Sequence, residues 1–116
     1  MVFRSHPEPA LCVEWNSTDS HVASGSKSGE INLNSIVSAS SVGKFKHKNS
    51  MGIKDLKYSP FKKQLLAAAS ENGSVYIYDV NSRQLHTHFQ NYHNSPVSAI
   101  AFSPVNHLLL CSAGLD

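Results

Sequence analysis

The sequence predicts an all-β protein made of a repeated unit, and three observations support this prediction. Short runs of alternating or apolar residues, rich in Val, Ile, Leu and Tyr, follow one another along the 116-residue chain, as β-strands do. Ser-Pro, Asn-Gly and Ser-Gly pairs separate these runs and mark turns. No segment of useful length carries the i, i+3, i+4, i+7 apolar stripe of a helix.

The expected strands follow in chain order as three similar units. In each unit a run with an aromatic residue near its end precedes a short apolar run, and in the first two units a glycine turn leads into a third run. These runs are LCVEWN (11–16), HVASGS (21–26) and INL (31–33); IKDLKYSP (53–60), QLLAAAS (64–70) and VYI (75–77); VSAIAFSP (97–104) and HLLLCSAG (107–114). With an outer fourth strand in each of the first two units, ten strands are expected.

Two local signals set the ends of these strands. Pro60 and Pro104 are expected to end theirs, because proline cannot donate to a strand ladder. Asn72-Gly73 is expected to form a two-residue hairpin turn in which both residues have a positive φ.

The units recur at a nearly constant interval. Trp15, Tyr58 and Phe102 occupy equivalent positions and are 43 and 44 residues apart. A repeat of about 40–45 residues with four short strands is the period of a β-propeller blade. We therefore predict a partial β-propeller of about two and a half blades, with units at about 6–46, 47–92 and 93–116 and no second domain. Because a closed ring needs about 4–8 blades, the chain is expected to be a fragment of a longer protein.

The repeated unit resembles that of the WD-repeat (WD40) family. The middle unit is most similar, with KH at 46–47, then LKYSP, LLAAAS and ENGSVYIYD. In the family, a His, a Ser, an Asp and a Trp form a hydrogen-bonded set within the blade. The matching positions here are His47, Ser70, Asn72 and Tyr78, with Asp79 closing the strand. Asn in place of Asp and Tyr in place of Trp would remove a charge-assisted hydrogen bond.

Within this family, LKYSPFKK and FSPVNHLL are more particular than the general repeat. They closely resemble the WD-repeat proteins that attach the gamma-tubulin ring complex to centrosomes and spindles. This resemblance implies a non-catalytic protein-interaction scaffold, cytoplasmic and located at centrosomes and spindle poles. The gamma-tubulin ring complex or centrosomal proteins would be its partners, for microtubule nucleation.

Lysine is concentrated in one part of the chain. Seven of the ten Lys and Arg residues lie between positions 44 and 63, where only Asp55 opposes them, so the local balance is 7 − 1 = +6. Loops on opposite faces of a propeller would divide this charge into two smaller groups. Lys46, Lys48 and Lys54 would lie on one face, and Lys57, Lys62 and Lys63 on the other. We take Lys46, Lys48, Lys54, Lys62 and Lys63 as candidate partner-binding residues; the alternative is that they are solvated loop lysines.

Enzyme, cofactor and metal signatures are missing from the sequence. GSKSG at 25–29 has Lys27 where a nucleophile elbow needs serine, and no phosphate-binding glycine loop occurs. Cys12 and Cys111 form no C-x-x-C pair, and His86 and His88 have no third ligand beside them. We therefore expect no catalytic residues, cofactor, metal or small-molecule substrate.

The sequence shows no targeting signal and leaves two alternative functions open. No apolar run is long enough to span a membrane, and no secretory signal is recognisable. One alternative function is a WD-repeat scaffold of another complex, such as a ubiquitin-ligase substrate receptor. The other is a nucleic-acid-binding module based on the lysines, which the lack of interleaved aromatic residues disfavours.

Overall fold

Ten strands and no helix are found in the part of the chain that the structure describes. The computed structural model describes residues 9–16, 20–46, 51–60, 62–89, 97–102 and 110–114, with the backbone alone for 88, 89, 97, 98, 102 and 110–114. The strands are β1 (Ala10–Trp15), β2 (His21–Ser26), β3 (Ile31–Ser35), β4 (Ser40–Phe45), β5 (Ile53–Tyr58), β6 (Leu65–Ser70), β7 (Val75–Asp79), β8 (Gln84–Phe89), β9 (Val97–Phe102) and β10 (Leu110–Gly114). The all-β prediction is confirmed.

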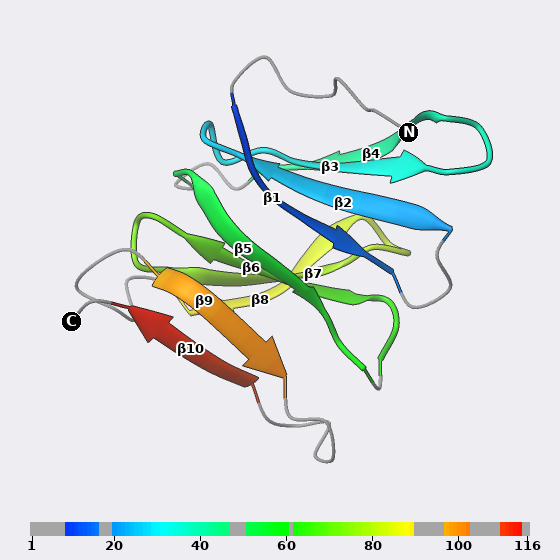
Figure 1. Ribbon diagram of the computed structural model, residues 1–116. Coiled ribbons are helices and arrows are strands. Elements are labelled where there is room, and N and C mark those ends of the chain that lie inside the picture. The colour runs from blue at the N-terminus through cyan, green and yellow to red at the C-terminus, as the bar shows by residue number, and fades with distance from the viewer. Residues whose placement is uncertain are drawn as a thin grey trace.

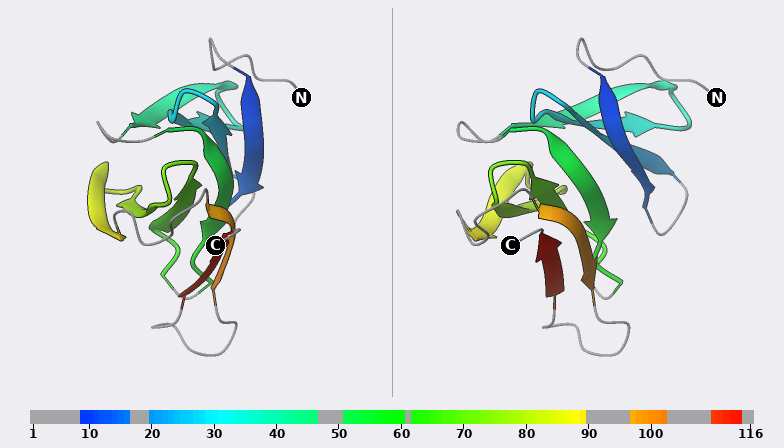
Figure 2. Two further views of the ribbon diagram at one scale, coloured as in Figure 1. Left: turned by 90° about the vertical axis from the view of Figure 1, so that its left-hand side faces the viewer. Right: turned by 60° about the vertical axis from the view of Figure 1, so that its left-hand side comes forward.

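The strands form three antiparallel sheets, here termed the first, second and third blades. The first has the order β1-β2-β3-β4, the second has the order β5-β6-β7-β8, and the third pairs β9 with β10. The inner strands β1, β5 and β9 neighbour one another (Figure 1). In Figure 2 (left) they follow one another along one side of the molecule, and β8 lies at the opposite side. This radial arrangement of successive sheets is that of a β-propeller.

The repeat extends to the backbone conformation. Gly29 and Gly73 have φ values of 91° and 86° and are 73 − 29 = 44 residues apart. Ala39 and Arg83 have φ values of 53° and 63°, again 83 − 39 = 44 residues apart. Corresponding loops of the first two blades therefore adopt the same left-handed conformation, with different side chains.

The loop between β6 and β7 corrects one expectation. Among the described residues a positive φ occurs at Gly73 but not at Asn72, so the two-residue turn predicted for this pair is wrong. Instead, the Gly73 N–H donates to the Ser70 carbonyl (3.2 Å), and the Ser70 N–H donates to the Ser74 carbonyl (2.9 Å). The Asn72 side chain accepts from the Ser74 N–H at 2.9 Å. This side-chain bond stabilises a three-residue loop that needs only one left-handed residue.

The second blade is buried on both of its faces. Leu66 and Ala68 of β6 belong to a cluster with apolar residues of the first blade, and Ala67 and Ala69 belong to another cluster with Ile100 of the third blade. All four β6 residues are fully buried. Because alternate side chains of a strand point to opposite faces, a strand between two neighbours needs apolar side chains on both faces, as LLAAA at 65–69 provides.

The first blade differs on its outward face. Ile31 and Leu33 of β3 pack toward the second blade, so strand alternation directs Asn32 and Asn34 to the other face. The equivalent residues of β7 are Tyr76 and Tyr78, which contribute to the core between the first two blades. The first blade is therefore more polar on this face than the second.

A candidate partner-binding surface at the trailing edge

Strand direction assigns the candidate lysines to two edges of the molecule. The pairs Cys12–Gly25, Gly25–Ile31 and Ile31–Phe45 place the start of β1, the end of β2, the start of β3 and the end of β4 together. We term this the leading edge, where β1 and β5 begin, and the opposite one the trailing edge, where they end. Their loops project on opposite sides of the blades.

The structure divides the lysines accordingly. Lys46 follows β4 and Lys54 is the second residue of β5, so both lie at the leading edge. Lys62 and Lys63 follow β5 and lie at the trailing edge. All four side chains are exposed, and Lys48 lies outside the described residues. No single patch contains all the described lysines.

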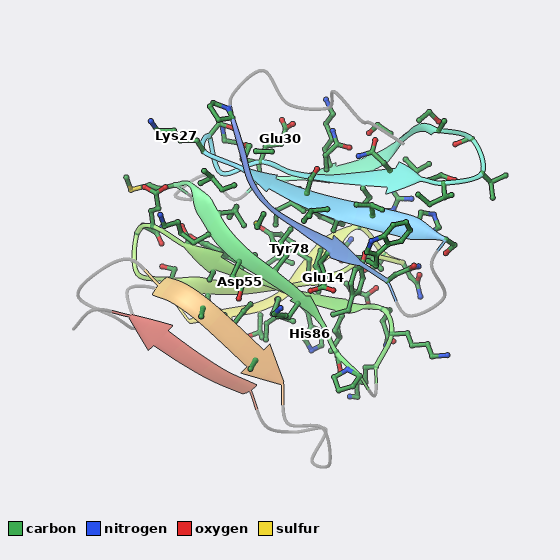
Figure 3. The ribbon with its side chains drawn as sticks, viewed as in Figure 1. Glu14, Lys27, Glu30, Asp55, Tyr78 and His86 are labelled. Carbon is green, nitrogen blue, oxygen red and sulfur yellow. The ribbon has the colours of Figure 1, made fainter. Side chains whose placement is uncertain are left out.

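Lys57 is partly neutralised from the neighbouring blade. Its ammonium lies 3.5 Å from a carboxylate oxygen of Glu14 on β1, and Figure 3 shows Glu14 between β1 and β5. Both side chains are partly exposed, so this pair contributes little stability. It does lower the local positive charge, which a count along the sequence cannot register.

A cavity of about 370 Å³ lies at the trailing edge between the first and second blades. Leu33 and Val42 of the first blade line it together with Tyr58 and Val80 of the second. Burial, and then the charge of Glu14, raises the pKa of Tyr58 to about 12. Its phenol is therefore a neutral hydrogen-bonding group at physiological pH.

One wall of the cavity is a hydrogen-bonded group from the first blade. The Asn16 side-chain amide donates to the Ser20 hydroxyl (2.8 Å), and its carbonyl accepts from the Ser20 and His21 N–H groups (2.9 and 3.1 Å). The Ser20 Oγ and His21 Nδ1 are 2.9 Å apart. The Asn16 amide nitrogen, which can only donate, also lies 3.4 Å from His21 Nδ1. This favours the tautomer with the proton on Nε2.

The opposite wall comes from two loops of the second blade and is polar and cationic. Lys63, Gln64, Asn81 and Arg83 line it. The Arg83 guanidinium donates to the Val42 carbonyl of the first blade and so bridges the two sheets. Among the described residues no carboxylate lines the cavity.

Asp79 orders the loop that carries Arg83. Its carboxylate accepts from the N–H groups of Asn81 (2.9 Å) and Ser82 (3.1 Å). Its carbonyl accepts from the Arg83 N–H (2.9 Å). In the loop that carries Lys63, the hydroxyl of buried Ser59 accepts from the Lys62 N–H at 3.1 Å. The Arg83 loop of the cavity wall is therefore preorganised.

Two of the repeat positions taken from the family pattern, Ser70 and Asn72, lie at the leading edge, while Tyr78 and Asp79 lie at the trailing end of β7. The buried Ser70 hydroxyl accepts from the Met51 and Asn72 N–H groups (3.2 and 3.3 Å). The Asn72 side-chain amide donates to the Tyr76 hydroxyl at 3.0 Å, while the Tyr78 ring packs against Phe45 with centroids 4.8 Å apart. Tyr76 therefore provides the tyrosine hydroxyl that Asn72 contacts. His47 lies outside the described residues.

Among the described residues no group of three or more His, Cys, Asp or Glu side chains could hold a metal ion. Cys12 is a free thiol whose pKa burial raises to about 11. No helix long and apolar enough to span a membrane occurs in the described ranges.

The profile of the WD40 family, described as WD domain, G-beta repeat, matches residues 1–33, 39–79 and 82–116. The chain belongs to the WD40 family. The matched WD40 repeat 39–79 begins with β4 of the first blade and ends with β7 of the second. The matched repeats 39–79 and 82–116 thus each contribute to two successive sheets.

Individual WD40 relatives are similar over most of the chain. It is 44% identical over 113 residues to Protein NEDD1 of Homo sapiens, which covers 97% of the chain and 17% of that protein. It is 47% identical over 89 residues to Protein NEDD1 of Bos taurus, which covers 77% of the chain and 14% of that protein. Histone acetyltransferase type B subunit 2 of Candida glabrata is 31% identical over 112 residues, which covers 97% of the chain and 26% of that protein. The chain therefore spans a minor part of each relative.

Solved structures show the same fold. The Cps50 (Swd1) β-propeller domain of Myceliophteria thermophila matches with a TM-score of 0.83 and 20% identity, covering 94% of this chain and 32% of that one. U3-55K matches with a TM-score of 0.84 and 23% identity, covering 94% and 34%. The chain therefore has the architecture of consecutive β-propeller blades.

Sequence reasoning found part of this surface and missed the rest. It identified Lys62 and Lys63 by their charge, but not His21, Asn81 or Arg83. His21 belongs to another unit, whereas Asn81 and Arg83 lie outside the lysine-rich stretch. The position of each loop within the repeated unit could have identified them, because it places the loops after β5 and β7 at the same edge of the sheets.

Proposed function

We propose that the chain is part of a non-catalytic β-propeller scaffold that targets the gamma-tubulin ring complex to the centrosome and mitotic spindle for microtubule nucleation. The observation that carries this proposal is the 44% identity to human Protein NEDD1 across 97% of the chain. Propellers of the same fold share only 20% and 23% identity with it. A shared fold alone therefore does not account for the 44% identity to human Protein NEDD1. The resemblance of LKYSPFKK and FSPVNHLL to the centrosomal WD-repeat proteins supports the same proposal.

Docking through loops on a rigid sheet scaffold is the proposed mechanism. Lys46 and Lys54 at the leading edge, and Lys62 and Lys63 at the trailing edge, present exposed ammonium groups. They suit a partner with an acidic surface, since complementary charge accelerates encounter and fixes orientation. Lys48, predicted to share a face with Lys46 and Lys54, lies outside the described residues.

The proposal is tested by expressing the fluorescently tagged 116-residue chain in dividing cells and measuring its enrichment at spindle poles relative to the cytoplasm. We expect enrichment that overlaps with gamma-tubulin. The matched control is the aligned segment of histone acetyltransferase type B subunit 2, which shares the WD40 repeats at 31% identity. That segment should stay diffuse.

Equal distribution of the chain and the control segment would contradict the proposal. Binding of purified chain to duplex or single-stranded nucleic acid at low salt, with a steep loss on adding salt, would instead favour the nucleic-acid alternative.

A further inference from the structure

We propose that the trailing-edge cavity binds an acidic side chain, carboxylate or phosphate, of a peptide segment in a protein partner. The cavity is defined by Leu33, Val42, Tyr58 and Val80, by the Asn16–Ser20–His21 wall, and by the loops that carry Lys63 and Arg83. The inference deepens the proposed function, because it rests on a protein partner and names the chemistry by which that partner would be held.

The size and lining of the cavity suit a single side chain. Its volume of about 370 Å³ is at the lower end of the range of about 300–1,000 Å³ that is usual for ligand pockets. Leu33 and Val42 can contact the apolar stem of a bound side chain, while the polar walls contact its head group. This combination of apolar surface and a few converging polar groups is typical of specific sites.

Charge determines the sign of the ligand. Lys63 and Arg83 line the cavity from two different loops, and no carboxylate joins them among the described residues. Arg83 uses one guanidinium nitrogen on the Val42 carbonyl, and a guanidinium has five N–H donors in all. A lysine ammonium adds three more. The tautomer that the Asn16 amide favours places a further donor on His21 Nε2. An anion would therefore meet several donors.

The surroundings of these donors favour a peptide over a nucleic-acid backbone. Nucleic acid is held by a continuous basic stripe that neutralises many phosphates. Here the exposed lysines are divided between two edges, and Glu14 lies 3.5 Å from Lys57. Two cations over an apolar base instead match one acidic side chain.

The order of the cavity walls reduces the entropic cost of binding. Asp79 accepts from three backbone N–H groups in the loop up to Arg83, two through its carboxylate and one through its carbonyl, and the Ser59 hydroxyl accepts from the Lys62 N–H beside Lys63. Loops that are already ordered lose little conformational entropy when a ligand binds.

The test measures binding of fluorescent seven-residue peptides that differ at the central position: glutamate, glutamine, phosphoserine or serine. We expect the glutamate and phosphoserine peptides to bind at least roughly tenfold more tightly than their neutral counterparts, as loss of charge-assisted hydrogen bonds requires. Amide chemical shifts should change at Lys63, Gln64, Asn81 and Arg83. Competition by inorganic phosphate shows whether free phosphate shares the site, and the ratio of the phosphoserine and glutamate affinities identifies the preferred head group.

Lys63→Met and Lys62→Met form the matched pair of variants. Lys63 lines the cavity and Lys62 does not, although both side chains are exposed in the same loop. Lys63→Met should weaken binding of the glutamate peptide about tenfold, while Lys62→Met should leave it within about twofold. Matching thermal unfolding midpoints verify that both variants fold.

Equal affinity for the glutamate and glutamine peptides would overturn the inference whether or not the variants fold. Equal losses in the two variants, or shift changes confined to the leading edge, would also overturn it. Spindle-pole enrichment that persists without peptide binding would remove the cavity from the mechanism but leave the targeting proposal in place. Peptide binding without spindle-pole enrichment would support the cavity as a site for an acidic side chain and contradict the targeting proposal.

Discussion

At the scale of single residues, Gly25 lies at a tight contact between the first two blades. A Cβ there would lie 2.6 Å from Ile53 Cγ2 and 2.9 Å from Cys12 Sγ. Gly25→Ala is expected to destabilise the fold by about 1–3 kcal/mol, since overpacking a buried contact forces its neighbours apart. Urea unfolding measures the change in unfolding free energy.

Gly43→Ala provides the comparison for this prediction. The atoms that its Cβ would meet belong to the flexible Arg83 side chain, which can move aside. Its cost should be clearly smaller, and equal losses at both positions would show that Gly25 is not the tight contact.

Cys12 gives the fold a pH dependence. Burial raises its thiol pKa from 9.0 to about 11, so the folded state holds the proton more tightly than the unfolded state. This contribution to stability is complete below about pH 9 and is lost as the pH rises toward 11. In a Cys111→Ser background, alkylation of Cys12 should be slow at neutral pH and much faster in concentrated urea. Equal rates in the two conditions would contradict burial of the thiol.

Residue-level prediction succeeded where the repeat constrains the backbone and failed where side chains compete. Pro60 follows the end of β5 at Tyr58 as expected, because proline limits a strand locally. The positive φ predicted for Asn72 was wrong, because the Asn72 side chain accepts from the Ser74 N–H and so stabilises a longer loop. The bond from Asn72 to Tyr76 also depends on which tyrosine faces the loop.

At the scale of strands, Asp55 joins β5 to β9. Its two carboxylate oxygens accept from the N–H groups of Leu56 (3.0 Å) and Ile100 (3.1 Å), and Figure 3 shows Asp55 near β9. Cys12, which is 43 residues earlier, plays the equivalent part by donating to the Ile53 carbonyl at 3.4 Å. Inner strands are thus linked by side chains rather than by a ladder.

Asp55→Ala should therefore loosen the third blade. Removing the acceptor leaves the Ile100 N–H without this partner, a loss of about 1–3 kcal/mol for a buried donor. Hydrogen exchange at the Ile100 amide should accelerate, with little change at amides of the first blade such as Leu33. Uniform acceleration throughout the chain would indicate global destabilisation instead.

The apolar run of β6 can be interpreted from the sequence as a strand, but the sequence does not show which neighbouring blade covers each of its faces. A continuous run such as LLAAAS predicts a strand covered on both faces. That Leu66 faces the first blade and Ala67 faces Ile100 follows from the order of the sheets in space.

At the scale of the whole molecule, β1 presents an exposed apolar row. Leu11, Val13 and Trp15 have 41%, 65% and 51% of their surfaces exposed, and strand alternation places them on one face. A contiguous apolar surface promotes association. Val13→Thr combined with Trp15→Ser should therefore reduce self-association of the chain, measured by sedimentation velocity over a range of concentrations.

Val37→Thr is the control for this double substitution. Val37 is 93% exposed but lies alone in the turn between β3 and β4. Its replacement should leave the sedimentation profile unchanged. A profile that the double substitution does not alter would contradict association through β1.

The sequence by itself determined the all-β class, the period of 43–44 residues, the ten strands and the WD40 resemblance, because these depend on interactions local to each repeat. Only the tertiary structure decided which side chains meet across blades: Lys57 with Glu14, Asp55 with the Ile100 N–H, and Lys63 with Arg83 around one cavity. These partners come from different strands and loops, and only the stacking of twisted sheets sets their distances.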